Sequence, residues 1–355
     1  MKKIVYVMNV DWNWIKQRPH FLAQELAKDN DVTVMYQHRY NRQGHQKRAA
    51  EGLNLHPIYV IPRGDRVNFL RNINRHIKKM SIQHQVKASK ADILYLTFPD
   101  QVGAIPSAFT GKVIYDCMDN HPAFLTDMDA RKEMENQEAA LMERADHVLV
   151  SSQKLTQVLL ERYGSKYSHK LTLVRNGYNG NVMPVENAAV NKQEEKYTIA
   201  YFGTISSWFN FEFLLKSLEE FPNLNYLLMG PAEVPIPKVP RLEYIGTVEH
   251  KELGNAIADA QCLMMPFVVN EIIESVDPVK LYEYINFNRN ILCVRYPEVE
   301  RFEPFAHFYT DYTSFRTQIE QLLNRSNVKY TLEQRNALLQ QSSWTERANT
   351  IRKLF

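Results

Sequence analysis

The chain has 355 residues, of which 45% are hydrophobic and 23% charged, and its formal net charge at pH 7 is +3. This ordinary globular balance predicts about two domains, gives no sign of a nucleic-acid partner, and includes no apolar run long enough to span a bilayer. The three cysteines, Cys117, Cys262 and Cys293, lie far apart in apolar runs, which favours reduced thiols in a cytosolic protein over a zinc site or a disulfide framework.

The first half of the chain alternates short apolar runs of strand length with patterns of helical spacing. The run Ile4–Met8 ends at polar residues too early for a signal peptide, so we expect a first strand there. Further strands are expected at Val32–Tyr36, Ile58–Ile61, Ile93–Leu96, Val113–Tyr115, Val148–Val150 and Leu171–Val174. Helices are expected at Lys16–Lys28, Val67–Val86, Asp127–Arg144 and Gln153–Tyr163. This alternation predicts a parallel sheet covered by helices on both faces.

The alternation stops in the polar stretch Tyr178–Glu195, which indicates a boundary, and then starts again. Strands are expected at Tyr197–Phe202, Tyr226–Met229, Leu242–Ile245, Cys262–Pro266 and Ile291–Val294. Helices are expected at Phe211–Glu220, His250–Asp259, around Lys280, and at Ser314–Asn324, Thr331–Gln340 and Trp344–Leu354. The sequence therefore predicts an α/β fold of two Rossmann-like domains, residues 1–180 and 181–343, with ligands in a cleft beyond the carboxyl ends of the strands.

Residues Asp277-Pro278-Val279-Lys280 predict a helix start that binds an anion. Asp277 is a favourable N-cap, and Pro278 fits the first helical position. The free N–H groups and the dipole of a helix N-terminus attract negative charge, to which Lys280 adds a full positive charge. Glu283 shares a face with Lys280, so this face can hold a phosphate and a ribose diol. An amphipathic surface helix with a local Lys–Glu pair is the alternative.

Small residues follow several expected strands of the second half. Gly203, Thr204 and Ile205 follow Tyr197–Phe202, and Gly230 and Val248 lie in the turns after the next two strands. Backbone N–H groups in such turns can approach a diphosphate or a nucleobase. For the Gly203 turn, an ordinary strand-to-helix turn is the alternative.

In the first half, Asp116, Asp119 and His121 follow the strand Val113–Tyr115. A carboxylate or imidazole at this place can take the proton of an acceptor hydroxyl. A cap or turn role for Asp119 and a surface-loop role for His121 are the alternatives. Asp127 and Asp129 form a DxD motif at a helix start, where capping is the favoured interpretation over metal binding. No His/Cys cluster has metal-ligand spacing, and the P-loop, GxGxxG and GxSxG motifs are absent.

Two tryptophans, Trp12 and Trp14, lie with Asp11 in the loop after the first strand, and Arg18 and His20 follow. These side chains can stack on a sugar or a lipid headgroup. A packed loop is the alternative.

Positive charge is concentrated between His38 and Lys90, where twelve lysines and arginines stand against Glu51 and Asp65. The expected helix Val67–Val86 is both basic and amphipathic, and such a helix can lie on an anionic membrane surface. A helix packed on its own domain with a solvated basic face is the alternative.

Taken together, these residues resemble a glycosyltransferase of the two-domain GT-B architecture, over nearly the whole chain. The resemblance rests on QRPHFLAQELA, YDCMDNHPAF, ADHVLVSSQKL, RNGYN, IAYFGTISSWFNFEFL, YIGTVEHKELGNAIADAQCLMMPF and VDPVKLYEYI. Within this group, the chain is most similar to bacterial teichuronic-acid and exopolysaccharide glycosyltransferases, and more distantly to the xanthan glucuronosyltransferase.

The resemblance implies that a nucleotide-sugar donor, by default a UDP-sugar, binds to the C-terminal domain. Lys280 matches the lysine that binds the donor phosphate, and Glu283 matches the glutamate that binds the ribose. An earlier glutamate of many relatives would fall at Ser275, so no role is carried to it. The expected donor-binding residues are Gly203, Thr204, Ile205, Gly230, Val248, Asp277, Val279, Lys280 and Glu283.

The resemblance also implies that the acceptor, a lipid-linked or other glycan, binds to the N-terminal domain. Asp119 lies near the catalytic base of inverting relatives, although retaining relatives are also similar, and His121 is the second catalytic candidate. The expected acceptor-binding residues are Asp11, Trp12, Trp14, Arg18 and His20, in a loop that replaces the glycine-rich first loop of the group. No metal and no cofactor are implied, and residues 344–355 are expected to cross back onto the first domain.

These inferences predict a cytoplasmic glycosyltransferase, held peripherally at the inner face of the cell membrane by the basic segment 66–90, which extends a lipid-linked glycan. A nucleotide-sugar 2-epimerase of the same architecture and a catalytically silent sugar-binding partner are the alternatives. No nucleic-acid partner is expected.

Overall fold

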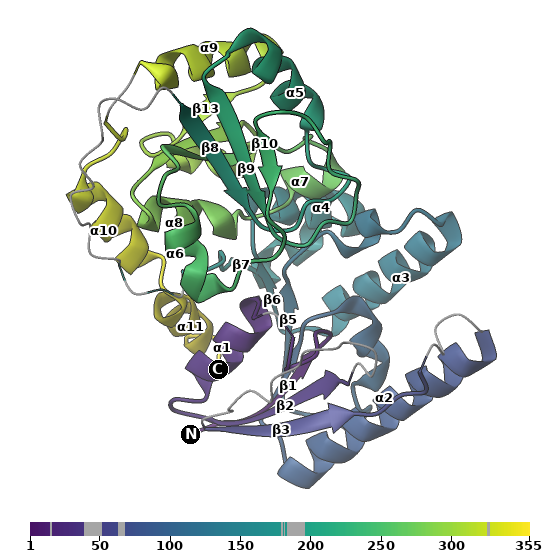
Figure 1. Cartoon of the computed structure of the whole chain (residues 1–355). Coiled ribbons are helices and arrows are strands. Elements are labelled where there is room, and N and C mark those ends of the chain that lie inside the picture. Colours follow the sequence, from purple (N-terminus) through teal and green to yellow (C-terminus); the bar gives the residue numbers. More distant parts are fainter. Residues whose placement is uncertain are drawn as a thin grey trace. The chain divides into compact units, whose positions relative to one another are not determined.

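The computed structural model describes residues 1–14, 16–38, 52–62, 68–178, 180, 182, 196–324 and 327–355. The chain divides into two compact units, here called unit 1 (Met1–Asn179 with Ser342–Phe355) and unit 2 (Gly180–Gln341) (Figure 1). The boundaries expected from the sequence were 180/181 and 343/344. Most of the stretch Tyr178–Glu195, interpreted above as a linker, lies outside the described residues.

Unit 1 contains a seven-stranded parallel sheet of order β3-β2-β1-β4-β5-β6-β7. The strands are β1 (Lys3–Met8), β2 (Asp31–Gln37), β3 (Leu53–Ile58), β4 (Ile93–Leu96), β5 (Lys112–Cys117), β6 (His147–Val150) and β7 (Leu171–Leu173). The strand order reverses between β1 and β4, and such a switch point is where ligands bind in open α/β sheets. The expected strand Ile58–Ile61 is wrong, because β3 is an edge strand whose half-exposed residues form no continuous apolar run.

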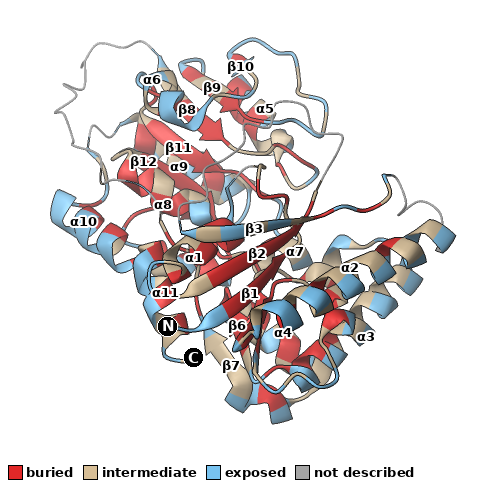
Figure 2. Cartoon of the chain, turned by 90° about the horizontal axis from the view of Figure 1, so that it is seen from below, coloured by how far each residue is buried: buried red, intermediate tan, exposed pale blue. Residues whose placement is uncertain are grey.

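The helices of unit 1 cover both faces of this sheet. They are α1 (Arg18–Leu26), α2 (Asn68–Ser89), α3 (Met128–Arg144), α4 (Gln153–Tyr163) and α11 (Trp344–Arg352), with 3-10 helices at Pro99–Ala104, His121–Phe124 and Ser165–Lys170. Alternate residues of β1 enter two separate cores: Val5 and Val7 pack with residues of α2, α3 and α4, and Ile4 and Tyr6 with residues of α1 and α11. The inner strands of this sheet are accordingly buried, whereas the edge strand β3 is half-exposed and the helices turn exposed faces to solvent (Figure 2).

The C-terminal helix α11 belongs to unit 1 and packs on α1. The rings of Phe21 and Trp344 stack at 5.2 Å, and Tyr178 N donates a hydrogen bond to Ser342 O at 2.7 Å. A Cβ atom at Gly177 would lie 2.7 Å from Trp344 Cδ2, so the glycine of the RNGYN motif is required by the close approach of the indole.

Unit 2 contains a six-stranded parallel sheet of order β10-β9-β8-β11-β12-β13, with its own switch point between β8 and β11. The strands are β8 (Tyr197–Phe202), β9 (Leu224–Met229), β10 (Leu242–Tyr244), β11 (Cys262–Met265), β12 (Asn290–Val294) and β13 (His307–Tyr309). The helices are α5 (Phe211–Glu220), α6 (Leu253–Ala256), α7 (Glu271–Glu274), α8 (Val279–Asn286), α9 (Tyr312–Leu323) and α10 (Leu332–Gln341), with 3-10 helices at His250–Glu252 and Pro297–Phe302.

Two expectations for unit 2 differ from the structure. The expected helix His250–Asp259 is a 3-10 turn followed by the one-turn helix α6, in which Gly254 and Asn255 have poor helix propensity. No strand was expected at β13, because three residues are too few to establish a period. The predicted α/β class is confirmed in both units.

Candidate functional site

Glycines with left-handed backbone conformation end three neighbouring strands of unit 2. Gly203, Gly230 and Gly246 follow β8, β9 and β10 and have φ values of 140°, 127° and 77°. A Cβ atom at position 230 would lie 2.1 Å from Gly203 O, so the two turns pack backbone to backbone. No L-residue with a side chain adopts such conformations without strain, which explains the glycines here.

The N–H groups of this edge are largely occupied within the protein. Gly203 N donates to Met229 O at 2.9 Å, and Ile205 N donates to Pro231 O at 2.8 Å. Of the three consecutive residues expected to bind a diphosphate, only Thr204 has an N–H group without a hydrogen bond to another described residue. The expected backbone cradle therefore reduces to one available donor in this turn.

Lys280, in the first turn of α8, extends to the end of β8. A Cβ atom at Gly203 would lie 2.1 Å from Lys280 Cε and 2.8 Å from Nζ. Within the described part of the chain, the Lys280 ammonium group makes no hydrogen bond and no ion pair within 4 Å. Burial lowers the pKa of Lys280, while the charge of Glu283 acts in the opposite direction. A partly buried cation without a close counter-ion, at the switch point of a parallel sheet, favours a bound anion.

Glu283 lies one turn after Lys280 and is held by a histidine. His250 Nε2 lies 3.3 Å from Glu283 Oε1. This hydrogen bond raises the pKa of His250, and a smaller desolvation effect opposes the rise. His250 was not among the site residues expected from the sequence, although it lies in the YIGTVEHKEL motif two residues after Val248.

Asp277 does not cap α8, contrary to the expectation from the sequence. The N-cap is Pro278, and the buried Asp277 carboxylate forms an ion pair with Arg301 at 2.5 Å. Arg301 also donates to Tyr282 OH at 3.1 Å. A buried carboxylate needs a charged partner, and Arg301 supplies it. Asp277 therefore anchors the start of α8 through this ion pair and not as an N-cap. Val279 is partly exposed at this terminus.

In unit 1, Asp119 and His121 follow β5, near the switch point. The Asp119 carboxylate is partly buried and has no hydrogen bond to another described residue. Burial raises the pKa of Asp119 to about 7; the Arg18 charge opposes this rise and the Asp116 charge adds to it. Burial lowers the pKa of His121 to about 4, and its ring packs on Phe98 at 4.6 Å. Asp119 therefore titrates near neutrality, and His121 is neutral there.

Asp116 and Arg18 form a buried ion pair inside unit 1. Arg18 Nη2 donates to Asp116 Oδ1 at 2.8 Å, and Tyr95 OH donates to Asp116 Oδ2 at 2.9 Å. Arg18 Nη1 also donates to Val174 O at 2.7 Å. These contacts use both charged groups within the protein, so Arg18 is not an accessible side chain of the opening loop.

The opening loop is mostly packed. Trp12 is 1% exposed, and a ring nitrogen of the fully buried His20 lies 3.1 Å from Trp12 O. Asp11 accepts a hydrogen bond from Asn13 N at 2.9 Å. Trp14 is partly exposed and is the most accessible of the expected acceptor residues.

Asp127 of the DxD motif caps α3, because its side chain accepts a hydrogen bond from Ala130 N at 2.8 Å. Among the described residues, no group of three histidine, cysteine or acidic side chains is arranged to hold a metal ion. None of the helices in the described ranges combines the length and the apolar character needed to cross a membrane.

Two doubly wound α/β units in series, the second with a lysine-bearing helix at its switch point, define the GT-B fold. The comparisons with known proteins confirm this fold and the resemblance to GT-B glycosyltransferases. No family model matches the chain. It is 20% identical over 273 residues to TuaH of Bacillus subtilis (strain 168), which carries the name of a teichuronic acid biosynthesis glycosyltransferase; the match covers 71% of this chain and 68% of TuaH.

Solved structures of glycosyltransferases match the chain over its whole length. Sucrose-phosphate synthase from Thermosynechococcus elongatus has a TM-score of 0.76 at 13% identity, covering 100% of this chain and 98% of that one. HepE from Anabaena, in complex with UDP and glucose, has a TM-score of 0.73 at 12% identity, covering 100% and 99%. The lipopolysaccharide outer core galactosyltransferase WaaB has a TM-score of 0.68 at 12% identity, covering 99% and 100%.

Proposed function

We propose that this protein transfers a glycosyl group from a nucleotide-sugar donor, a UDP-sugar, to a lipid-linked or other glycan acceptor in cell-wall or exopolysaccharide assembly. The observation that carries the proposal is the Lys280 ammonium group, partly buried against the backbone of Gly203 at the switch point of unit 2. HepE, a structural neighbour, has been solved in complex with UDP and glucose and with UDP-glucose. These complexes support a UDP-sugar as the donor. The TuaH likeness supports the pathway.

In the proposed reaction, the bond between the anomeric carbon and the donor diphosphate breaks, and the diphosphate leaves with the electron pair. Lys280 faces the charge that develops on this leaving group, and preorganised positive charge at that place stabilises the transition state. Glu283, held by His250, accepts hydrogen bonds from the ribose hydroxyls. The acceptor oxygen forms the new bond to the anomeric carbon, and in an inverting reaction its proton passes to the Asp119 carboxylate.

A transfer assay tests the proposal and separates it from the alternatives. Purified protein is incubated with a panel of nucleotide sugars, with and without glycan acceptors, and products are identified by mass spectrometry and NMR. We expect glycosylated product and free UDP only when donor and acceptor are both present, apart from slow donor hydrolysis. An isomerised donor formed without acceptor would indicate an epimerase. Donor binding without any turnover across the panel would indicate a silent binding protein.

We further propose that the protein acts at the inner face of the cell membrane, where a lipid-linked acceptor would lie. The outward side of α2 supports this: Phe69 is 72% exposed and Met80 53% exposed, and the exposed lysines Lys79 and Lys87 lie beside them along the helix. Exposed apolar side chains flanked by lysines are typical of a helix that docks on an anionic surface.

A further inference from the structure

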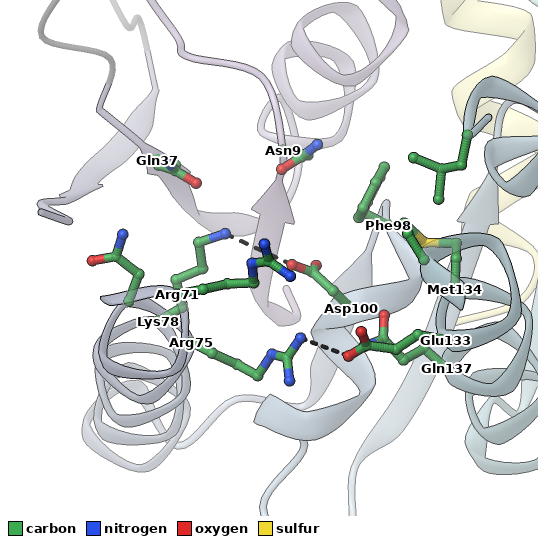
Figure 3. A pocket seen from close by; sticks show the side chains of 13 residues that line it. Asn9, Gln37, Arg71, Arg75, Lys78, Phe98, Asp100, Glu133, Met134 and Gln137 are labelled. Carbon is green, nitrogen blue, oxygen red and sulfur yellow. Dashed lines mark hydrogen bonds and ion pairs between the residues drawn. The ribbon is translucent and has the colours of Figure 1, made fainter. Parts of the chain in front are cut away.

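A pocket of about 410 Å³ opens in unit 1, a size that accommodates one or two sugar rings. Asn9, just after β1, and Phe98, just after β4, lie in its wall, so the pocket is at the switch point of the sheet. Helices α2 and α3 supply its two sides (Figure 3). None of the acceptor residues expected from the sequence lines it.

The side formed by α2 is cationic. Arg71, Arg75 and Lys78 extend from this helix toward the pocket (Figure 3). Arg75 Nη2 pairs with Glu133 Oε1 at 2.7 Å, and Lys78 Nζ lies 3.7 Å from Asp100 Oδ2. Among the described residues of the lining, three cations stand against two carboxylates, so the formal charges of these side chains sum to a positive value.

The opposite side presents apolar side chains beside the polar Glu133 and Gln137, and it reaches the candidate catalytic loop (Figure 3). Leu125, Met134 and Phe98 lie there, and the amides of Asn9 and Gln37 add hydrogen-bonding groups near the strand ends. Phe98 also packs on His121, which connects the pocket to the loop that carries Asp119. Apolar surface for the face of a ring, amides for hydroxyl groups and an excess of positive charge are together suited to an acidic saccharide.

We propose that this pocket binds an acidic sugar unit of the acceptor, with the ring against Phe98, Leu125 and Met134 and the carboxylate or phosphate facing Arg71 and Lys78. The proposal rests on the proposed function and deepens it, because it assigns a charge to the acceptor class. Carboxylate and phosphate share the required chemistry, and the experiment separates them.

Saccharides are titrated calorimetrically into the full-length protein without donor, in matched pairs: oligoglucuronides against neutral oligoglucosides of equal length, and glucose 6-phosphate against glucose. We expect at least one acidic member to bind about tenfold more tightly than its neutral partner. The pair in which this preference appears identifies the anionic group. Equal affinity within both pairs, or no binding of any saccharide, would overturn the proposal.

Two variants and a control locate the site. Arg71→Gln should lower affinity for the acidic member by about tenfold and leave the neutral member unchanged. Ala130→Trp places an indole in the pocket and should lower affinity for both. The control, Lys87→Gln, removes an exposed charge of the same helix outside the lining and should change neither. An equal effect of Arg71→Gln and Lys87→Gln would overturn the proposal, because it would indicate unspecific attraction to the helix surface.

Titration of UDP into each variant, with circular dichroism as a check of folding, separates this inference from the proposed function. We expect UDP affinity to be unchanged in all three variants, because no lining residue belongs to unit 2. Absence of UDP binding in the wild type would contradict the proposed function, whereas the saccharide titrations decide the pocket. If Arg71→Gln weakens binding to anionic vesicles but not to saccharides, the pocket is a lipid-headgroup site and the proposal is wrong.

Discussion

The Lys280 side chain occupies the space that a side chain at Gly203 would need, since a Cβ atom there would lie 2.1 Å from Lys280 Cε. The backbone of Gly203, with φ of 140°, adds a conformation that L-residues rarely adopt. The turn after β8 and the first turn of α8 are therefore coupled: the glycine is present so that the ammonium group can reach the sheet edge.

The first prediction concerns the donor site. Lys280→Ala removes the charge that faces the diphosphate, and Glu283→Ala removes the acceptor of the ribose hydrogen bonds. A charge-assisted hydrogen bond contributes about 1.5–3 kcal/mol, so UDP affinity should fall tenfold or more in each variant. Calorimetric titration measures this, with Lys251→Ala as the control, because Lys251 is an exposed lysine of unit 2 paired with Glu249. Unchanged affinity in both site variants would refute the assignment.

A second prediction tests the coupling between Gly203 and Lys280. Gly203→Ala should displace the ammonium group and lower UDP affinity nearly as much as Lys280→Ala. The double variant should then be little worse than either single one, because residues in contact are not additive. Thermal unfolding of each variant serves as the check that unit 2 is folded. Additive losses of affinity would show that the two residues act independently.

A third prediction concerns His250, whose side chain is 76% exposed. His250→Gln should lower UDP affinity by less than about fivefold, because an exposed ion pair contributes about 0.2–1 kcal/mol. In the Glu283→Ala background the same substitution should have no effect, since its partner is then absent. If His250→Gln lowers UDP affinity as much in the Glu283→Ala background as in the wild type, His250 contacts the donor itself.

The placement of Lys280 and Glu283 on one helical turn of unit 2, beyond glycine turns, could be predicted from the sequence because its signals are local. Lys280 and Glu283 are one helical turn apart, and the glycines follow strands whose apolar runs are plain. Asp277 was misassigned because its partner, Arg301, is 24 residues away and a carboxylate before a proline has the local pattern of a cap. Arg18 and Asp116 are 98 residues apart, and no spacing rule indicates that they meet inside one core.

The pocket of unit 1 could not be predicted for the same reason. Its walls come from two helices and three strand ends, and only the strand order brings them together. The basic character of α2 was visible in the sequence. The sequence did not show which basic residues of α2 face the pocket and which face outward, because helical spacing does not show which side of a helix faces a neighbour.

A fourth prediction follows from the raised pKa of Asp119, which is about 7 compared with an ordinary value of 3.8. The folded state holds this proton to higher pH than the unfolded state, so the contribution of Asp119 to stability falls as pH rises from about 4 to 7 and is constant above that window. Asp119→Asn removes this cost, and the variant should be more stable than wild type at pH 8 by roughly 1–4 kcal/mol. At pH 4 the two should be nearly equal in urea denaturation.

Catalytic activity should increase with pH over the range in which the contribution of Asp119 to stability falls. If Asp119 is the base, wild-type turnover should rise with pH through about 7, and Asp119→Asn should lower it by about 10²–10⁴ while UDP affinity is retained. The anomeric configuration of the product, read by NMR, should be inverted relative to the donor. Retained configuration together with retained turnover of the variant would exclude this role.

The last prediction concerns the membrane and the two sides of α2. Phe69, Met80 and Lys87 are separated by nearly whole numbers of helical turns, so they share the outward side, and Lys79 borders it. Arg75 and Lys78 instead pair with Glu133 and Asp100 at the pocket. Replacing every basic residue of α2 by glutamate would therefore change both the pocket side and the outward side of the helix. The double substitution Lys79→Glu with Lys87→Glu changes the outward side alone.

Wild-type protein should sediment with anionic vesicles at low salt and not with neutral ones. Each basic side chain near an anionic surface contributes about 1 kcal/mol, and the attraction fades beyond a Debye length of about 10 Å at 0.1 M salt. The Lys79→Glu/Lys87→Glu variant should therefore bind anionic vesicles tenfold or more weakly than the wild type. Phe69→Ser should also lower vesicle affinity, but by a factor that does not change with salt concentration. Arg71→Gln is the matched control and should still sediment. If the wild type stays in the supernatant with anionic vesicles at low salt, α2 is a solvated basic helix and the proposed location at the membrane is wrong.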